Sequence, residues 1–261
     1  MKLIPIADKV WILKTMKTIA FISNKGGTGK TTLSVNMAVT AHNLGYRVMI
    51  GDLDPQRSSV DWAKGRKADG PAVSPFKRGS LFPAQFAADR AGLDLLILDT
   101  PSASPEISLQ AAKAADLSVL VSRPTVMDLR TMTDMVTTLK SLKLKSVILL
   151  NQAPSQRNGR EPTLVKEAID ILVGFGLPVA PCCFRSRTAF QASISCGLSA
   201  AEQFPDSAAA KEIEAVWAYL ADQLALKSKL KSPSPKIETP ERLKSIWYRP
   251  RMQVDPQALA G

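Results

Sequence analysis

A glycine-rich segment between an expected strand and an expected helix most constrains the fold of this chain. The segment, residues 25–32, follows an apolar run over Lys17–Ser23 that predicts a strand, and it overlaps the start of Lys30–Leu44, where apolar residues recur at helical spacing. Glycines let backbone N–H groups turn inward around an anion, and the helix N-terminus adds its positive end. The segment therefore predicts a phosphate-binding loop, in which Lys30 bridges the β- and γ-phosphates and the Thr31 hydroxyl is a ligand of Mg²⁺. The residues of the turn itself are Gly26, Gly27, Thr28 and Gly29.

The rest of the chain repeats this alternation of apolar runs and helical patterns. Such a pattern predicts a doubly wound α/β fold, a mostly parallel sheet with helices on both faces, in which ligands bind at the carboxyl ends of the strands. Further strands are expected at Tyr46–Leu53, Leu93–Thr100, Asp116–Ser122, Lys145–Asn151 and near Pro178–Phe184. Further helices are expected at Ser58–Gly65, Pro105–Ala115, Met127–Leu142, Thr163–Phe175 and Ala208–Leu226.

Acidic residues end two of the expected strands. Asp52 and Asp54 follow the second strand in the stretch Gly-Asp-Leu-Asp-Pro-Gln, and Asp99 ends the apolar strand Leu93–Thr100. A carboxylate at the end of a buried strand is costly unless it has a partner, which Mg²⁺ or its water supplies. Each stretch also has a structural interpretation, as a turn that ends a strand. Together with the loop, they predict a Mg²⁺ ligand at Asp99 and carboxylates at Asp52 and Asp54 that reach the γ-phosphate and the attacking water.

Charge and cysteine usage narrow the class of protein further. The 261 residues carry 34 Lys and Arg against 23 Asp and Glu, a net charge of +11, which favours a polyanionic partner such as nucleic acid or an anionic membrane. Three cysteines, two of them adjacent, give neither a disulfide framework nor a metal-ligand spacing. We find no apolar run long enough to span a bilayer and no signal peptide, and we expect a cytoplasmic protein.

Two terminal segments fall outside the α/β pattern. Residues 1–15 precede the first core strand and are expected to be an extension, and residues 16–226 form the predicted phosphate-binding α/β domain. Residues 227–261 are rich in Pro, Ser and Lys, with eight Lys and Arg against three Asp and Glu, a net of +5. This composition predicts a disordered basic tail.

The glycine-rich loop departs from the standard phosphate loop, because Asn24 stands where that motif has glycine and Lys25 adds a second lysine. This form resembles the deviant loop of the ParA/MinD family of ATPases, and the order of the three motifs resembles the short ParA-type partition ATPases. The resemblance covers about residues 16–226. It implies a slow, Mg²⁺-dependent ATP hydrolase in which two subunits sandwich two ATP molecules. Lys25 would then reach across the dimer to the partner's phosphates, Asp54 would orient the attacking water with Asp52 beside it, and Thr32 would contact the α-phosphate.

The resemblance also implies contacts outside the phosphate loop. Asn151 ends a strand where family members hydrogen-bond the adenine base, and Phe184 would pack near it. Arg185 and Arg187 lie where the family has DNA-binding arginines. A turn residue at Asn151 and a solvated loop with incidental charge at the two arginines are equally good interpretations of the sequence.

The function implied by the resemblance is partition of a plasmid, a chromosome or another cargo. An ATP-bound homodimer would coat nonspecific DNA on the nucleoid, and a ParB-like or other adaptor would stimulate hydrolysis. The alternative is a MinD-like membrane-associated positioning ATPase, for which the apolar and basic residues of 242–251 would form the membrane segment, although Pro250 interrupts it. An iron–sulfur carrier is disfavoured, since the cysteines do not follow the third motif.

Overall fold

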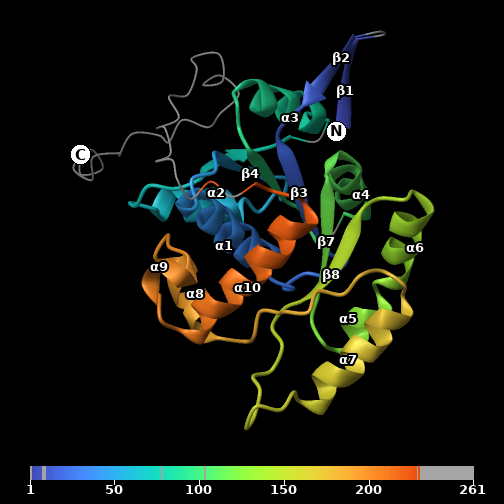
Figure 1. Ribbon diagram of the computed structural model, residues 1–261, viewed down its shortest axis with the longest axis vertical. Coiled ribbons are helices and arrows are strands. Elements are labelled where there is room, and N and C mark those ends of the chain that lie inside the picture. The colour runs from blue at the N-terminus through green and yellow to red at the C-terminus, as the bar shows by residue number, and fades with distance from the viewer. Residues whose placement is uncertain (1, 8–9, 78, 103, 228, 230–261) are drawn as a thin grey trace, which may run out of the picture.

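A six-stranded sheet forms the centre of the protein in the computed structural model, which describes residues 2–7, 10–77, 79–102, 104–227 and 229. The strand order is β5-β4-β6-β3-β7-β8, and every neighbouring pair is parallel. The carboxyl ends of all six strands therefore lie at one edge of the sheet (Figure 1). The strands are β3 (Lys17–Ile22), β4 (Val48–Asp52), β5 (Ala72–Pro75), β6 (Leu95–Asp99), β7 (Leu117–Ser122) and β8 (Ser146–Leu150).

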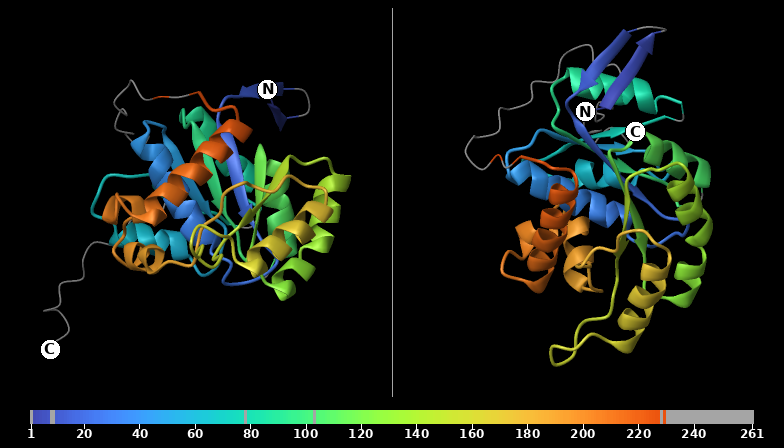
Figure 2. Two further views of the ribbon diagram at one scale, coloured as in Figure 1. Left: turned by 60° about the horizontal axis from the view of Figure 1, so that its bottom comes forward. Right: turned by 45° about the vertical axis from the view of Figure 1, so that its right-hand side comes forward.

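Helices cover both faces of this sheet (Figures 1 and 2). Side chains alternate along each strand, so Ile19 and Phe21 enter one core while Ala20 and Ile22 enter the other. The first core is closed by α1 (Lys30–Asn43), α2 (Ser58–Gly65), α8 (Thr188–Ser195), α9 (Ala200–Gln203) and α10 (Ala208–Gln223). The second is closed by α3 (Leu81–Arg90), α4 (Pro105–Ala114), α5 (Val126–Arg130), α6 (Thr133–Ser141) and α7 (Thr163–Gly174). The predicted doubly wound α/β class is confirmed.

Two predicted elements differ from the structure. The helix expected over Met127–Leu142 is two helices, because the Thr131 hydroxyl and backbone N–H both bond to the carbonyl of Asp128 and end α5 there. The strand expected near Pro178–Phe184 forms only isolated bridges, at Val179 and Arg185, since proline lacks the N–H that a ladder needs. The prediction also missed β5, α3, α8 and α9.

The N-terminal residues form a separate two-stranded antiparallel hairpin. Its strands, β1 (Lys2–Ala7) and β2 (Val10–Lys14), pair with each other and lie near α3 in Figures 1 and 2. The chain joins the core where the backbone N–H groups of Thr15 and Met16 donate to Asp89 Oδ1, at 3.0 and 2.7 Å. The predicted boundary at residue 15 stays a prediction, and the predicted tail lies outside the described residues, except for its first residues, 227 and 229. None of the described helices combines the length and apolar character that crossing a bilayer requires.

We expect a chain that begins at Met16 to fold and bind nucleotide. The α-amine of Met16 would remain beside Asp89, and β3 with its neighbours would stay intact. Thermal unfolding followed by circular dichroism should shift by no more than about 5 °C, the effect of roughly 1–2 kcal/mol in a domain of this size. A chain that begins at Ser23 is the control, because it lacks β3 and should not fold. Loss of cooperative unfolding in the Met16 chain would show that the hairpin is part of the core.

Candidate nucleotide-binding site

The glycine-rich loop joins β3 to α1 at the carboxyl edge of the sheet, as its sequence predicts. Gly27 and Gly29 adopt φ values of 71° and 85°, which side-chain-bearing residues rarely take. A Cβ on Gly29 would lie only 2.2 Å from Nδ2 of Asn151, so both its conformation and its packing require glycine. The loop thus combines a helix N-terminus with a tight glycine turn, which is the local structure that binds phosphate.

Lys30 opens α1 and is folded against its own loop. Its side chain is buried, and Nζ donates to Ser23 Oγ at 3.2 Å. Burial lowers the pKa of Lys30, although the charges of Asp99 and Asp54 oppose that shift. An anion in the loop would favour the charged ammonium further. The position and charge of Lys30 fit the predicted contact with a nucleotide phosphate.

Two buried carboxylates lie next to each other at the ends of β4 and β6. Asp52 and Asp99 are directly opposite in the strand register, and both are almost inaccessible to solvent. Burial, and then the charge of Asp99, raise the pKa of Asp52 to about 6, while the backbone N–H groups of Val60 and Asp54 act in the opposite direction. Burial also raises the pKa of Asp99, against hydrogen bonds from Ser59 and Thr31. Such a pair favours a nearby cation.

This carboxylate pair fits a Mg²⁺ site that a nucleotide completes. Oδ1 of Asp99 is buried without a hydrogen-bond partner among the described residues, while its other oxygen accepts from Ser59. Mg²⁺ prefers oxygen ligands and is usually held by one or two carboxylates together with phosphates and waters. In the described part of the chain, no group of three or more His, Cys, Asp or Glu is arranged to hold a metal by itself. Asp99 and the Thr31 hydroxyl are the side chains that would hold Mg²⁺.

Asp54 occupies a more open position than Asp52. Its side chain is half-buried, and Oδ1 accepts from the backbone N–H of Gln56 at 2.9 Å. Arg57 stabilises the turn that carries Asp54, because its backbone is left-handed and its guanidinium donates to the carbonyl of Asp52. The carboxylate is therefore held close enough to the phosphate loop for its charge to act on Lys30, and it is only half-buried, so a water molecule can reach it.

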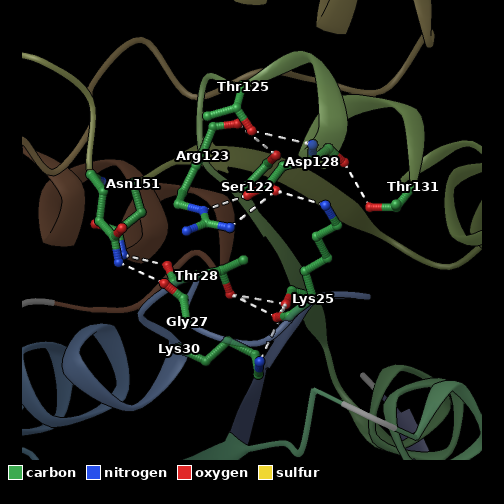
Figure 3. A network of polar contacts seen from close by, with 12 residues as sticks. Lys25, Gly27, Thr28, Lys30, Ser122, Arg123, Thr125, Asp128, Thr131 and Asn151 are labelled. Carbon is green, nitrogen blue, oxygen red and sulfur yellow. Dashed lines mark hydrogen bonds and ion pairs between the residues drawn. The ribbon is translucent and has the colours of Figure 1, made fainter.

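Lys25 is tied to a carboxylate within its own chain (Figure 3). Its Nζ lies 3.3 Å from Oδ1 of Asp128, whose carboxylate also accepts two hydrogen bonds from Arg123, at 2.6 and 3.1 Å. Burial disfavours the charge on Asp128, but hydrogen bonds and charges from Arg123 and Lys25 outweigh it and lower the pKa of Asp128. No role was predicted from the sequence for Asp128 or Arg123. Their position after β7, the neighbour of β3, is the signal that points to them.

The predicted adenine contacts separate in the structure. Nδ2 of Asn151 donates to the carbonyl of Thr28 at 2.6 Å, and Nε2 of Gln152 donates to Gly27 at 2.7 Å, so the end of β8 is bound to the phosphate loop. Phe184 is instead fully buried, and its ring stacks on that of Phe190 with 4.5 Å between the ring centroids. This burial leaves no free ring face for a base, which speaks against the predicted contact of Phe184 with adenine.

The two arginines predicted to bind DNA are engaged in ion pairs inside the chain. Arg185 pairs with Glu161, and its side chain is only 11% exposed. Arg187 pairs with Glu212 at 2.5 Å. A direct phosphate contact by either guanidinium would have to compete with a neighbouring carboxylate. The DNA-binding role of Arg185 and Arg187 remains a prediction, and the ion pairs give both a structural role.

The fold and the glycine-rich loop define a P-loop nucleotide-binding protein. The model of the CobQ/CobB/MinD/ParA nucleotide binding domain matches residues 19–193, and the chain belongs to this family, as its resemblance to the ParA/MinD group predicts.

Similar proteins include the maintenance of carboxysome distribution protein A of Gloeobacter kilaueensis, 34% identical over 46% of this chain and 55% of its own. The chromosome-partitioning ATPase Soj of Thermus thermophilus is 30% identical over 39% of this chain and 52% of its own, so the chain spans about half the length of these relatives. Among solved structures, the septum site-determining protein MinD of Pyrococcus horikoshii with Mg-ADP has a TM-score of 0.63 at 18% identity, and the match covers 83% of this chain and all of that one. At this identity the likeness shows the fold alone.

We expect Asp52→Asn to stabilise the protein when Mg²⁺ and nucleotide are absent. A carboxyl whose pKa rises from 3.8 to about 6 on folding destabilises the folded state above pH 6, by up to about 3 kcal/mol. Its contribution to unfolding free energy becomes less unfavourable as the pH falls through 6 and vanishes below 3.8. The stabilisation by asparagine should therefore be largest at pH 7.5 and shrink by pH 5. Thermal melts at the two values measure it, with Asp54→Asn as a half-exposed control. Equal melting temperatures of the parent and Asp52→Asn at pH 7.5 would contradict the argument.

Proposed function

We propose that this chain is a ParA-type ATPase that dimerises on ATP and Mg²⁺, binds nonspecific DNA and distributes a cargo with the help of an adaptor protein. The observation that carries the proposal is the second lysine of the phosphate loop, because Lys25 is the residue that separates the ParA/MinD loop from the standard one. Asp52, Asp54 and Asp99 accompany it at the same sheet edge. Membership of the CobQ/CobB/MinD/ParA family supports nucleotide binding by this chain.

The chemistry follows from positions around the loop. Backbone N–H groups of Gly26 to Thr31 and the ammonium of Lys30 bind the phosphates, and Thr32 contacts the α-phosphate. Thr31 and Asp99 would hold Mg²⁺, which would supply positive charge beside the transferred phosphoryl group. Asp54 would orient the attacking water, since its carboxylate is only half-buried and its charge acts on Lys30 in the phosphate loop.

Lys25 is suited to act on a second subunit. Its side chain is 31% exposed while its Nζ is held at Asp128, so the ammonium stands at the rim of the site rather than inside it. A cation contributed by another molecule stabilises the charge that develops in phosphoryl transfer. Hydrolysis would then be slow in the monomer and would be activated by the dimer. Its rate would set how long the ATP-bound dimer lasts.

The cargo class is inferred from the similar proteins. Their names refer to carboxysome distribution and chromosome partition, which are both tasks of placing large objects in a cell. We infer that this chain partitions a plasmid, a chromosome or another cargo, and that a ParB-like or other adaptor releases it by stimulating hydrolysis. The net charge of +11 supports a nucleoid-associated state. The segment that would favour a MinD-like membrane role, residues 242–251, lies outside the described residues.

Substitution of the two loop lysines tests the proposal. Lys30→Ala should weaken ATP binding about 10- to 150-fold, the equivalent of roughly 1.5–3 kcal/mol for a lost charge-assisted contact. Lys25→Ala should bind ATP nearly as well as the parent but fail to dimerise and hydrolyse it. Fluorescent-nucleotide titration and light scattering separate the two effects, with Lys143→Ala as a control at the opposite sheet edge. A full-strength ATP dimer without Lys25 would refute the trans role.

Asp54→Ala should separate binding from hydrolysis. The variant keeps Lys30, Thr31 and Asp99, so ATP, Mg²⁺ and dimerisation should remain, while turnover should fall at least tenfold because the water is no longer oriented. Phosphate release measured on the ATP dimer provides the readout. Turnover at the parental rate would remove Asp54 from the mechanism.

A further inference from the structure

The connection between β8 and α7 presents two arginines at the tip of a rigid turn. Arg157 and Arg160 exchange both backbone hydrogen bonds, at 3.1 and 2.9 Å, around Asn158 and Gly159. These central residues have φ values of 49° and 70°, the conformation of a type I′ turn, for which Asn-Gly is the preferred sequence. In Figures 1 and 2 this connection projects from the body of the protein beside the start of α7.

The turn places two like charges on the same side of the chain. Residues that oppose each other in an antiparallel pair point to one face, and like charges in that arrangement repel. Both arginines are exposed, and within the described ranges neither guanidinium has a carboxylate partner. In the adjoining groove between α7 and α10, by contrast, Arg185 and Arg187 each pair with a glutamate. An external anion would relieve the repulsion at the tip.

The base of the loop is fixed, so the tip is held in place. Arg185 donates to the carbonyl of Pro154 at 2.8 Å and pairs with Glu161, which also accepts from Gln156. Arg185 thereby joins the two ends of the connection. A ligand at the tip would not have to order a flexible loop, which reduces the entropic cost of binding.

The composition of the tip favours one class of polyanion. Residues 155–160 read Ser-Gln-Arg-Asn-Gly-Arg and contain no apolar side chain that could insert into a lipid layer. They instead offer guanidinium, amide and hydroxyl donors, the groups that contact the sugar–phosphate backbone of DNA. Guanidinium also matches the geometry of a phosphate better than ammonium does.

We propose that the turn at residues 154–162 is the contact of this chain with the backbone of duplex DNA, made by Arg157 and Arg160, with Arg185 as a positioning residue. The inference rests on the proposed function, which it deepens by naming the DNA contact. It replaces the expectation that Arg185 and Arg187 touch phosphate themselves. A dimer would present four such arginines.

The test compares Arg157→Ala/Arg160→Ala with the charge-matched Arg90→Ala/Lys143→Ala in the full-length protein. Arg90 and Lys143 are exposed and precede β6 and β8, so they lie at the opposite edge of the sheet. The readout is fluorescence anisotropy of a labelled random-sequence duplex with ATP and Mg²⁺ between 50 and 200 mM KCl. The tip variant should lose at least tenfold in affinity, and the slope of log affinity against log salt should fall by roughly 0.9 for each lost phosphate contact, or roughly 3.6 in a dimer. The control should retain the parental slope.

Gly159→Val tests the geometry without removing charge. No atom lies within 4 Å of the added Cβ, but a β-branched residue at φ 70° is strained, so the turn should open while the fold remains. Duplex affinity should fall several-fold although both arginines are present. Parental affinity in this variant would overturn the role of the turn.

Three further results would overturn the inference. The first is a parental salt slope in the tip variant. The second is an equal loss of duplex affinity in the control variant. The third is a tip variant that loses binding to anionic vesicles while its affinity for duplex DNA stays parental. ATP affinity and dimer mass measured on the same samples report separately on the proposed function. If both are normal and the parent protein binds no duplex, the DNA contact fails while the ATP-dependent dimer stands.

Discussion

Asp52 and Asp99 lie opposite each other at the carboxyl ends of β4 and β6, both buried, and the surrounding elements are arranged to tolerate that pair. The first turn of α2 donates to both carboxylates, through the backbone of Val60 and the hydroxyl of Ser59. The ammonium of Lys30 lies close enough for its charge to act on Asp99. One carboxylate oxygen still lacks a partner among the described residues, so these contacts compensate only part of the cost. A cation and a phosphate group together would complete the balance, which explains why a nucleotide with Mg²⁺ suits this edge of the sheet better than either alone.

The cationic side chains of the chain differ in whether a neighbouring carboxylate already neutralises them. Lys25 shares Asp128 with Arg123, and Arg185 and Arg187 each have a glutamate, whereas the arginines at residues 157 and 160 have no carboxylate partner in the described ranges. An exposed ion pair is weak, and a ligand phosphate can replace it at low cost. A buried or bidentate pair is harder to replace. Of the paired cations compared above, Lys25 is the one that belongs to the phosphate loop, so its ammonium is the one that the nucleotide of a second subunit could recruit.

The parts of the fold that depend on local sequence patterns could be predicted from the sequence. Apolar runs and helical spacing identified most of the sheet and the helix after the phosphate loop, and the glycines marked a turn that the structure contains. Non-local packing decided the rest. The burial of Phe184 depends on a stacked partner from α8, and the ion pair of Lys25 depends on a residue after β7, which no pattern around Lys25 contains. The short strand β5 and the break before α6 carry too few periodic residues to be recognised from sequence.

The same connection that carries the arginine turn begins at the phosphate loop, and this has a thermodynamic consequence. Asn151 and Gln152 donate to the carbonyls of Thr28 and Gly27, the turn that would close on a nucleotide. A nucleotide that shifts these carbonyls changes the contacts on which the start of the connection depends. If the arginine turn moves with them, ATP and DNA become coupled, and coupling between two binding equilibria is reciprocal. DNA would then raise the affinity for ATP by the same factor by which ATP raises the affinity for DNA. A turn that does not move with these carbonyls would bind DNA equally in both nucleotide states of one subunit, and dimerisation alone would then make binding depend on ATP.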